Sequence, residues 1–279
     1  MDRPPAFSAA SNATSDARST RVAPPVAVVP FKVMPLFDIH YSSPAIGMQT
    51  GMHVILPNGP GPFPMVYMLH GLSDDHTAWQ RWTTIENHAY RLGIGLALLD
   101  GGRSFYCDTP GTTRQFEKHI LHAVEFVDAT FRTIAKPTAR GIGGLSMGGY
   151  GSLKIALAHP ELFGSAASHS GAVDMVSWTK REKLGDVQDI WPKGKVPAHD
   201  DIRKLLAKPG KKPAIYLDCG TEDFLLLDNR TIKADLVKRQ MPHIYLEHPG
   251  NHNWEYWQAH IGEALDFHAG HFRKAKTLK

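Results

Sequence analysis

The stretch Gly144-Leu145-Ser146-Met147-Gly148 decides the fold, because it follows the pattern G-x-S-x-G and lies between an expected strand and an expected helix. Residues 140–145 are strand-like, and residues 150–158 have helical character. In a strand–turn–helix of this kind the serine occupies a strained turn at the tip of the strand. Glycines two residues before and after it remove the Cβ atoms that would collide with neighbouring backbone. We therefore interpret Ser146 as a nucleophile.

Outward from this motif, short apolar runs alternate with longer helical patterns. The alternation indicates the α/β class, a mostly parallel sheet with helices on both faces. Before this alternating region, strand-like segments at 31–37 and 52–56 flank a turn-rich stretch. This pattern predicts that the first strands of the sheet are antiparallel. The later strands are expected at residues 65–69, 94–99, 140–145, 164–168, 214–217 and 243–247, and the helices at 77–92, 114–132, 150–158, 228–240 and 255–272.

One domain is expected to account for most of the chain. The 279 residues are 42% hydrophobic and 21% charged, which is ordinary globular usage. We expect a catalytic domain at 30–272, with a small helical insertion at 174–213 where the pattern becomes charged. Residues 1–29 are rich in Ala, Ser, Thr and Pro, which predicts a disordered tail. Residues 273–279 form a basic C-terminal tail.

The charge balance does not indicate a polyanionic partner. The 31 Lys and Arg residues against 27 Asp and Glu give a net charge of +4, and the basic clusters are scattered without interleaved aromatic residues. We expect no nucleic-acid partner. Because no run of 18 apolar residues is present, no membrane partner is expected either. Cys107 and Cys219 are expected as free thiols and the N-terminus lacks an apolar signal core, which favours a cytoplasmic location. The protein is a possible homo-oligomer, and the sequence leaves its oligomeric state open.

A catalytic serine needs a general base that is itself oriented by an acid. In folds with this strand–turn–helix motif, the catalytic residues follow one another along the chain in the order serine, acid, histidine. His252 is the expected base, because it follows the last strand in a turn and precedes the last helix. Asp223 is the expected acid, since it lies in the loop after a strand. Glu222 is the alternative, and Asp218 is expected to lie on the strand itself.

The 16 histidines raise the question of a metal. No H-E-x-x-H motif is present, and the Pro249-Gly250 pair prevents His248 and His252 from sharing a helical face. We therefore expect no metal and no other cofactor.

Two backbone N–H groups are expected to form an oxyanion hole. One belongs to Met147, directly after the nucleophile, and the other is expected from the segment His70-Gly71-Leu72-Ser73 at a strand end, with the N–H of Leu72 preferred. A substrate pocket should lie beside them. Its expected lining includes Gly71, Asp100, Ser104 and Trp254, while Trp79, Trp82 and Trp257 are either core residues or further parts of the wall.

Several segments together resemble one family. The segments are YMLHGLSDDHTAW at 67–79, GLSMGGYG at 144–151, HPELF at 159–163, CGTED at 219–223 and GNHNW at 250–254. They are similar to the esterase D branch of the α/β-hydrolases, and within it to the tributyrin-esterase-like carboxylesterases, over about residues 30–270. Relatives in that branch include S-formylglutathione hydrolases, feruloyl and acetyl-xylan esterases and secreted mycolyltransferases.

The resemblance implies an α/β-hydrolase fold and a serine esterase. It carries over the nucleophile, acid and base onto Ser146, Asp223 and His252, and the oxyanion donors onto Leu72 and Met147. We expect a carboxylesterase that acts on small, short-chain acyl esters. The alternatives are an S-formylglutathione hydrolase or a carbohydrate (acetyl or feruloyl) esterase. An acyltransferase and a non-catalytic binding scaffold are the alternatives of another class. The GNHNW segment differs from the Tyr-Asp-His-Ser-Tyr type typical of formylglutathione hydrolases.

Overall fold

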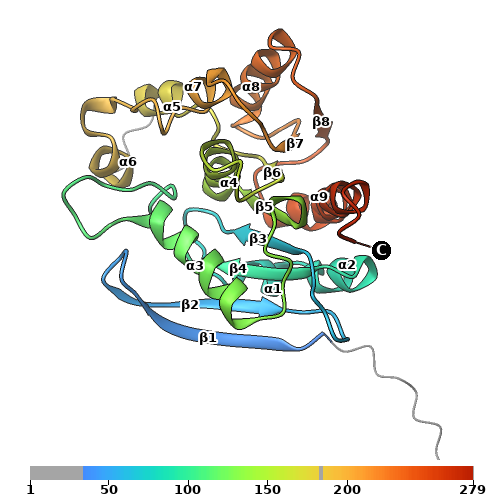
Figure 1. The fold of residues 1–279 in the computed structure, drawn as a ribbon. Coiled ribbons are helices and arrows are strands. Elements are labelled where there is room, and N and C mark those ends of the chain that lie inside the picture. Colours follow the sequence, from blue (N-terminus) through green and yellow to red (C-terminus); the bar gives the residue numbers. More distant parts are fainter. Residues whose placement is uncertain (1–33, 182–184, 279) are drawn as a thin grey trace, which may run out of the picture. The chain divides into compact units, whose positions relative to one another are not determined.

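The computed structural model describes residues 34–181 and 185–278, so the predicted tail at 1–29 lies outside the described residues. These residues contain an eight-stranded sheet with the order β1-β2-β4-β3-β5-β6-β7-β8 (Figure 1). β1 and β2 pair antiparallel with each other, β2 pairs antiparallel with β4, and the remaining neighbours are parallel. The expected α/β fold with an antiparallel entrance is therefore confirmed. The strands are β1 Leu36–Ser43, β2 Met48–Ile55, β3 Met65–Leu69, β4 Gly95–Leu99, β5 Arg140–Leu145, β6 Ser165–His169, β7 Ala214–Gly220 and β8 His243–His248.

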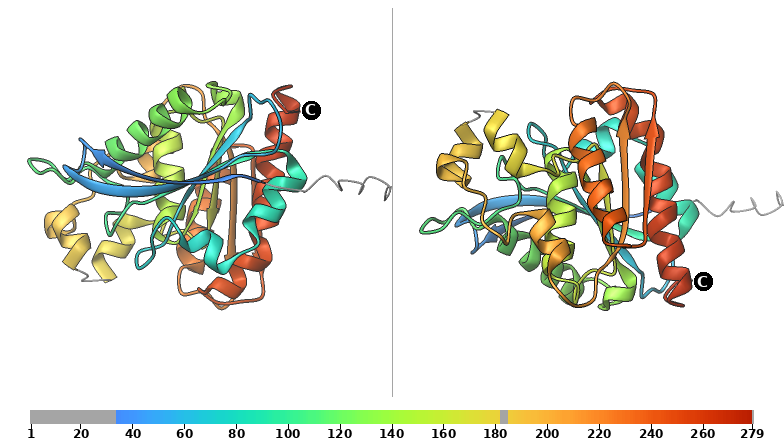
Figure 2. Two further views of the ribbon diagram at one scale, coloured as in Figure 1. Left: turned by 90° about the horizontal axis from the view of Figure 1, so that it is seen from below. Right: turned by 90° about the horizontal axis from the view of Figure 1, so that it is seen from above.

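Helices cover both faces of the sheet, as Figure 2 shows. One face packs against α3, α4 and α8, and the other against α1, α2 and α9, while α7 packs on α4. Because the central strands are buried on both sides, their side chains alternate between two separate apolar cores. No described helix could cross a membrane. The helices are α1 Ala78–Trp82, α2 Ile85–Leu92, α3 Phe116–Thr130, α4 Met147–Ala158, α5 Met175–Arg181, α6 Gly185–Ile190, α7 Ile202–Ala207, α8 Leu226–Lys238 and α9 Trp254–Lys274, with short 3-10 turns at Pro137–Ala139 and Pro192–Gly194.

Three elements differ from the sequence-based expectation, and one of them is β2, which was expected at 52–56 and begins at Met48. The first strand was expected at 31–37, whereas β1 begins at Leu36 and extends to Ser43. As the edge strand it is half exposed, so it lacks the apolar run by which buried strands are found. The helix expected at 77–92 is two helices, because Thr83 between them has extended backbone angles of φ −136° and ψ 167°.

A buried lysine joins the nucleophile helix to two other segments. The Lys154 side chain on α4 is fully buried, and its Nζ lies 2.6 Å from Glu117 Oε2 on α3 and 3.4 Å from Asp200 Oδ1 just before α7. Burial opposes the charged form of Lys154, but these carboxylates outweigh it and raise the pKa of the amine above its usual value. The Lys154 ammonium therefore offsets one of the two negative charges behind Ser146.

Replacing Lys154 by methionine is expected to lower the free energy of unfolding by about 3–5 kcal/mol, because two carboxylates would lose their buried partner. Urea denaturation followed by circular dichroism measures the loss. The exposed Lys180 provides the control, and Lys180→Met should stay within about 0.5 kcal/mol of wild type. Equal stability of Lys154→Met and Lys180→Met would contradict the assignment.

Candidate active site

Ser146 lies in the turn between β5 and α4, with backbone angles of φ 53° and ψ −116°. A positive φ is strained for a residue with a side chain, and it points the hydroxyl away from the sheet edge. The two flanking glycines make the turn sterically possible. A Cβ atom on Gly144 would lie 2.5 Å from the Gly148 backbone, and one on Gly148 would lie 2.4 Å from the Leu69 carbonyl oxygen. The two glycines therefore allow the strained turn that places the partly buried Ser146 at the tip of β5.

Ser146, His252 and Asp223 form one continuous chain of hydrogen bonds. The His252 Nε2 lies 2.9 Å from Ser146 Oγ, and its Nδ1 lies 2.8 Å from Asp223 Oδ2. Because a carboxylate accepts, Nδ1 carries the proton and Nε2 is free to accept from the serine hydroxyl. The second oxygen of Asp223 accepts the Leu225 N–H at 2.8 Å, which fixes the carboxylate. The three side chains come from the ends of β5, β7 and β8, which meet at one edge of the sheet.

The other two carboxylates of this loop have different partners. Asp218 lies on β7, as expected, where its buried Oδ2 is 2.7 Å from His169 Nδ1 and its Oδ1 accepts the Tyr256 hydroxyl at 3.1 Å. Glu222 is exposed and accepts hydrogen bonds from the Thr221 hydroxyl and the Gly250 N–H. Neither contacts His252, so the geometry favours Asp223 as the acid.

The loop after β3 lies beside the serine. A Cβ atom on Gly71 would lie 2.7 Å from Leu145 Cδ1 and 2.9 Å from Asp74 Oδ2, so a larger residue would have to displace them, and it would lie 3.9 Å from Ser146 Cβ, in ordinary contact. The peptide between Gly71 and Leu72 is oriented by the buried His70. Its Nε2 accepts the Gly101 N–H at 2.9 Å, which leaves Nδ1 protonated and donating to the Gly71 carbonyl at 2.6 Å. Since C=O and N–H of a trans peptide point in opposite directions, this bond also sets the direction of the Leu72 N–H.

The second N–H group is that of Met147, the first residue of α4. The first N–H groups of a helix have no intrahelical acceptor and carry partial positive charge. Leu72 and Met147 both line the same cavity as Ser146. The structure therefore places both expected donor residues at the cavity that contains Ser146, and their role stays a prediction.

The cavity over Ser146 has a volume of about 670 Å³. Gly71 and Trp254 line it, as expected, together with His252. Its wall is largely apolar, which suits an uncharged acyl or alcohol group. The apolar lining consists of Leu72, Trp82, Phe105, Leu145, Met147, Ala172, Trp178, Phe224, Leu225, Trp254 and Trp257.

Asp100 and Ser104, which the sequence suggested as substrate contacts, do not line this cavity. The Asp100 carboxylate accepts the Gly102 N–H at 2.9 Å, and the buried Ser104 hydroxyl donates to the Gly101 carbonyl at 2.6 Å. Both side chains are engaged in shaping their own loop. The same loop places Phe105 in the wall, which the sequence analysis did not single out.

The tryptophans divide between core and cavity. Trp79 is fully buried and donates its Nε1–H to the Leu69 carbonyl at 3.1 Å, so it belongs to the core. Trp82 and Trp254 stack with ring planes 17° apart and both line the cavity. On the other side Phe224, which directly follows the acid, is 66% exposed and packs against His252. Its position next to Asp223 is the sequence signal that could have identified it.

Comparison with known proteins identifies a family and several similar structures. The model of a family described as putative esterase matches residues 43–268. An acetyl esterase of Caldicellulosiruptor saccharolyticus is 28% identical over 222 residues, which are 72% of this chain and 82% of the relative. A substrate-bound fluorophosphonate-binding serine hydrolase of Staphylococcus aureus superposes with a TM-score of 0.78 at 26% identity, over 85% of this chain and 98% of its own. An S-formylglutathione hydrolase of the same organism gives 0.78 at 27% identity, over 85% and 99%.

Proposed function

The chain belongs to the putative esterase family, and we propose that it hydrolyses short-chain acyl esters through an acyl-serine intermediate on Ser146. It is a carboxylic ester hydrolase by family and by its similarity to serine hydrolases. The observation that carries the proposal is the hydrogen-bonded chain from Ser146 through His252 to Asp223. The name of the acetyl esterase relative supports a short acyl group.

In the first half of the reaction His252 Nε2 takes the proton of the Ser146 hydroxyl as Oγ attacks the ester carbonyl carbon. Negative charge moves to the carbonyl oxygen, where the N–H groups of Leu72 and Met147 stabilise it. Asp223 stabilises the imidazolium that forms. The tetrahedral intermediate then collapses, the protonated His252 donates its proton to the leaving alcohol, and the acyl group stays on Oγ.

In the second half water replaces the alcohol. His252 Nε2 accepts a proton from the water as its oxygen attacks the acyl carbon, and the same two N–H groups receive the oxyanion. Collapse returns the proton to Ser146 Oγ and releases the carboxylic acid. The His252 side chain is 17% exposed, so water has access to it.

A substrate series tests the acyl preference. For p-nitrophenyl acetate, butyrate, octanoate and palmitate we expect kcat/KM to fall steadily beyond butyrate. S-formylglutathione completes the series. A value for octanoate above that for acetate would contradict the short-chain proposal, and a much higher value for S-formylglutathione would favour thioester hydrolysis.

A carbohydrate (acetyl or feruloyl) esterase is the second candidate, favoured by the exposed aromatic rings at the cavity. Trp82 is 53% exposed and Phe224 is 66% exposed, and both line the cavity. Flat apolar faces of this kind suit stacking against an aryl group or a sugar ring.

Trp82→Ala is expected to raise KM for methyl ferulate or an acetylated xylo-oligosaccharide about tenfold, the equivalent of one lost ring contact of about 1.4 kcal/mol. The kcat on p-nitrophenyl acetate should change little, since Trp82 does not contact the reacting atoms. Steady-state kinetics on the paired substrates measures the difference. The partly exposed Phe37 lies outside the cavity, and Phe37→Ala is the control. A uniform effect of Trp82→Ala on all esters would argue against a stacking surface.

We also propose a cytoplasmic location. Cys107 and Cys219 are both buried and free, which is the usual state of cysteines in a reducing compartment. Fractionation of cells that express the full-length chain tests this proposal.

A further inference from the structure

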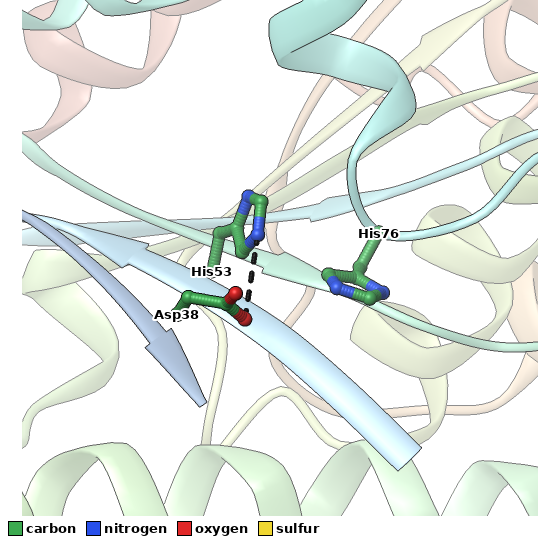
Figure 3. Close-up of side chains that lie close together, drawn as sticks. All are labelled: Asp38, His53 and His76. Carbon is green, nitrogen blue, oxygen red and sulfur yellow. Dashed lines mark ion pairs between the residues drawn. The ribbon is translucent and has the colours of Figure 1, made fainter. Parts of the chain in front are cut away.

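Three ligand-type side chains meet at the antiparallel edge of the sheet, outside the catalytic cavity. Asp38 on β1, His53 on β2 and His76 in the loop before α1 direct their side chains toward one another (Figure 3). One ligand atom from each lies within 4.8 Å of the other two. We propose that Asp38, His53 and His76 form a binding site for a divalent transition metal, with Zn²⁺ as the ion that fits this ligand set best.

The strand register builds this site. Asp38 lies directly opposite His53 in the β1–β2 ladder, so their side chains leave the same face of the hairpin. Gly51 lies two residues before His53 on that face. A Cβ atom there would stand 2.5 Å from the His76 ring, so any larger residue would displace His76. The glycine thus gives the third side chain its place beside the other two.

A second layer of hydrogen bonds prepares His53 as a ligand. Glu86 accepts from the Gln80 amide nitrogen, because a carboxylate can only accept. The Gln80 amide oxygen therefore faces His53 Nδ1 and accepts its proton. This leaves the Nε2 of His53 unprotonated and facing Asp38. A histidine ligand whose other nitrogen donates to a fixed oxygen is the usual arrangement around zinc.

The ligand atoms are spaced for a metal. His53 Nε2 and Asp38 Oδ1 are 3.6 Å apart, and both are acceptors once the proton lies on Nδ1. In a tetrahedral zinc site with bonds of about 2.0–2.1 Å, neighbouring ligand atoms are about 3.4 Å apart. The rings of His53 and His76 are perpendicular, at 89°, with centroids 4.8 Å apart. Because His53 Nε2 and Asp38 Oδ1 are both acceptors, a cation between them would stabilise their 3.6 Å approach.

His76, the third member of the cluster, has an unsatisfied ring nitrogen. Among the described residues its buried Nδ1 has no hydrogen-bond partner. The Asp100 carboxylate lies 4.0 Å from that nitrogen and adds negative charge to the surroundings. On β1, the exposed His40 has its Nε2 3.3 Å from Asp38 Oδ1, but it lies outside the group of ligand atoms that are all within 4.8 Å of one another.

A second group of ligand-type residues, His248, His260 and Glu263, is a poorer site. Its two imidazole rings stack in nearly parallel planes, 12° apart and 3.9 Å between centroids. Because nitrogen lone pairs lie in the ring plane, an ion between stacked rings would sit far out of both planes. Glu263 also already accepts from His260 Nδ1 at 3.0 Å. This group therefore provides a matched control.

Metal binding would tie the loop that carries the oxyanion donor to the β1–β2 hairpin. His76 lies four residues after Leu72, and the loop between them holds no regular element. None of the three proposed ligands lines the cavity. The site is therefore a clamp on this loop, and it stands apart from the ester chemistry proposed for Ser146.

Zinc titration of the tag-free full chain tests the proposal, after EDTA treatment and dialysis. Isothermal calorimetry and competition with a chromophoric chelator should show one zinc ion per chain. Asp38→Asn and His53→Gln are expected to weaken binding at least about 100-fold. Gln80→Leu removes no ligand and should weaken it about 10- to 100-fold. His260→Asn should bind zinc as the wild type does.

Zinc-soaked crystals of the wild type give a readout that depends on no variant. An anomalous difference peak among Asp38, His53 and His76 would support the site. The proposal is overturned by a peak only at His248, His260 and Glu263, by the absence of any peak, or by zinc affinity that Asp38→Asn and His53→Gln leave unchanged. Circular dichroism of each metal-free variant shows whether it is folded.

Discussion

Replacing Ser146 by alanine is expected to lower kcat on p-nitrophenyl acetate about a millionfold, because the covalent route through the acyl-serine is lost. His252 and Asp223 then have no nucleophile to activate, and the remaining N–H groups and cavity give only the small acceleration of an oriented site. The cavity wall is unchanged by the loss of one hydroxyl, so KM should change far less than kcat. Steady-state kinetics and labelling by a fluorophosphonate probe measure the effect.

The control for this prediction is another serine on the same domain. Ser42 is exposed on β1, and Ser42→Ala should keep wild-type turnover and wild-type labelling. Fluorophosphonate labelling of Ser146→Ala at the wild-type rate would show that another residue is the nucleophile. Turnover within tenfold of wild type would lead to the same conclusion.

Local patterns in the sequence were sufficient for the elbow and the central strands. β3 and β5 begin and end at the residues expected, 65–69 and 140–145, because both are buried on two faces and bounded by glycine, proline or a loop. The motif around Ser146 is a fixed pattern of five residues, which is recognisable in the sequence even though Gly148 owes its small size to the Leu69 carbonyl on β3. Features encoded by a few adjacent residues can therefore be predicted from the sequence alone.

Features that depend on contacts between distant segments of the chain could not be predicted from local sequence patterns. Asp100 follows a central strand, which suggested a substrate contact, but its carboxylate accepts the Gly102 N–H and lies 3.3 Å from His70 Nε2 in the loop after β3. The proposed metal ligands come from two strands and a loop and follow no spacing motif, so the sequence analysis expected no metal. Only the β1–β2 register brings Asp38 opposite His53.

Replacing Asp223, the expected acid, should have the second large effect on kcat, because Asp223 determines the tautomer of His252. Both oxygens of Asp223 act as acceptors, one from His252 Nδ1–H and one from the Leu225 N–H. An asparagine amide has one oxygen and one NH₂ group. If its oxygen keeps the bond to Leu225, its NH₂ group faces Nδ1, which must then accept. The reverse orientation sets two donors against each other at Leu225, inside a buried loop, and this is the more costly arrangement.

Asp223→Asn is therefore expected to move the imidazole proton to Nε2, where it donates to Ser146 Oγ and can no longer accept from it. The kcat should fall about ten-thousandfold with little change in KM, since the cavity keeps its shape. The loop neighbour Glu222 provides the matched control. Glu222→Gln should stay within about tenfold of wild type, because this exposed carboxylate does not contact His252. If Glu222→Gln had the larger effect, the acid would be Glu222, and the hydrogen bond between Asp223 and His252 would not be the one that orients the base.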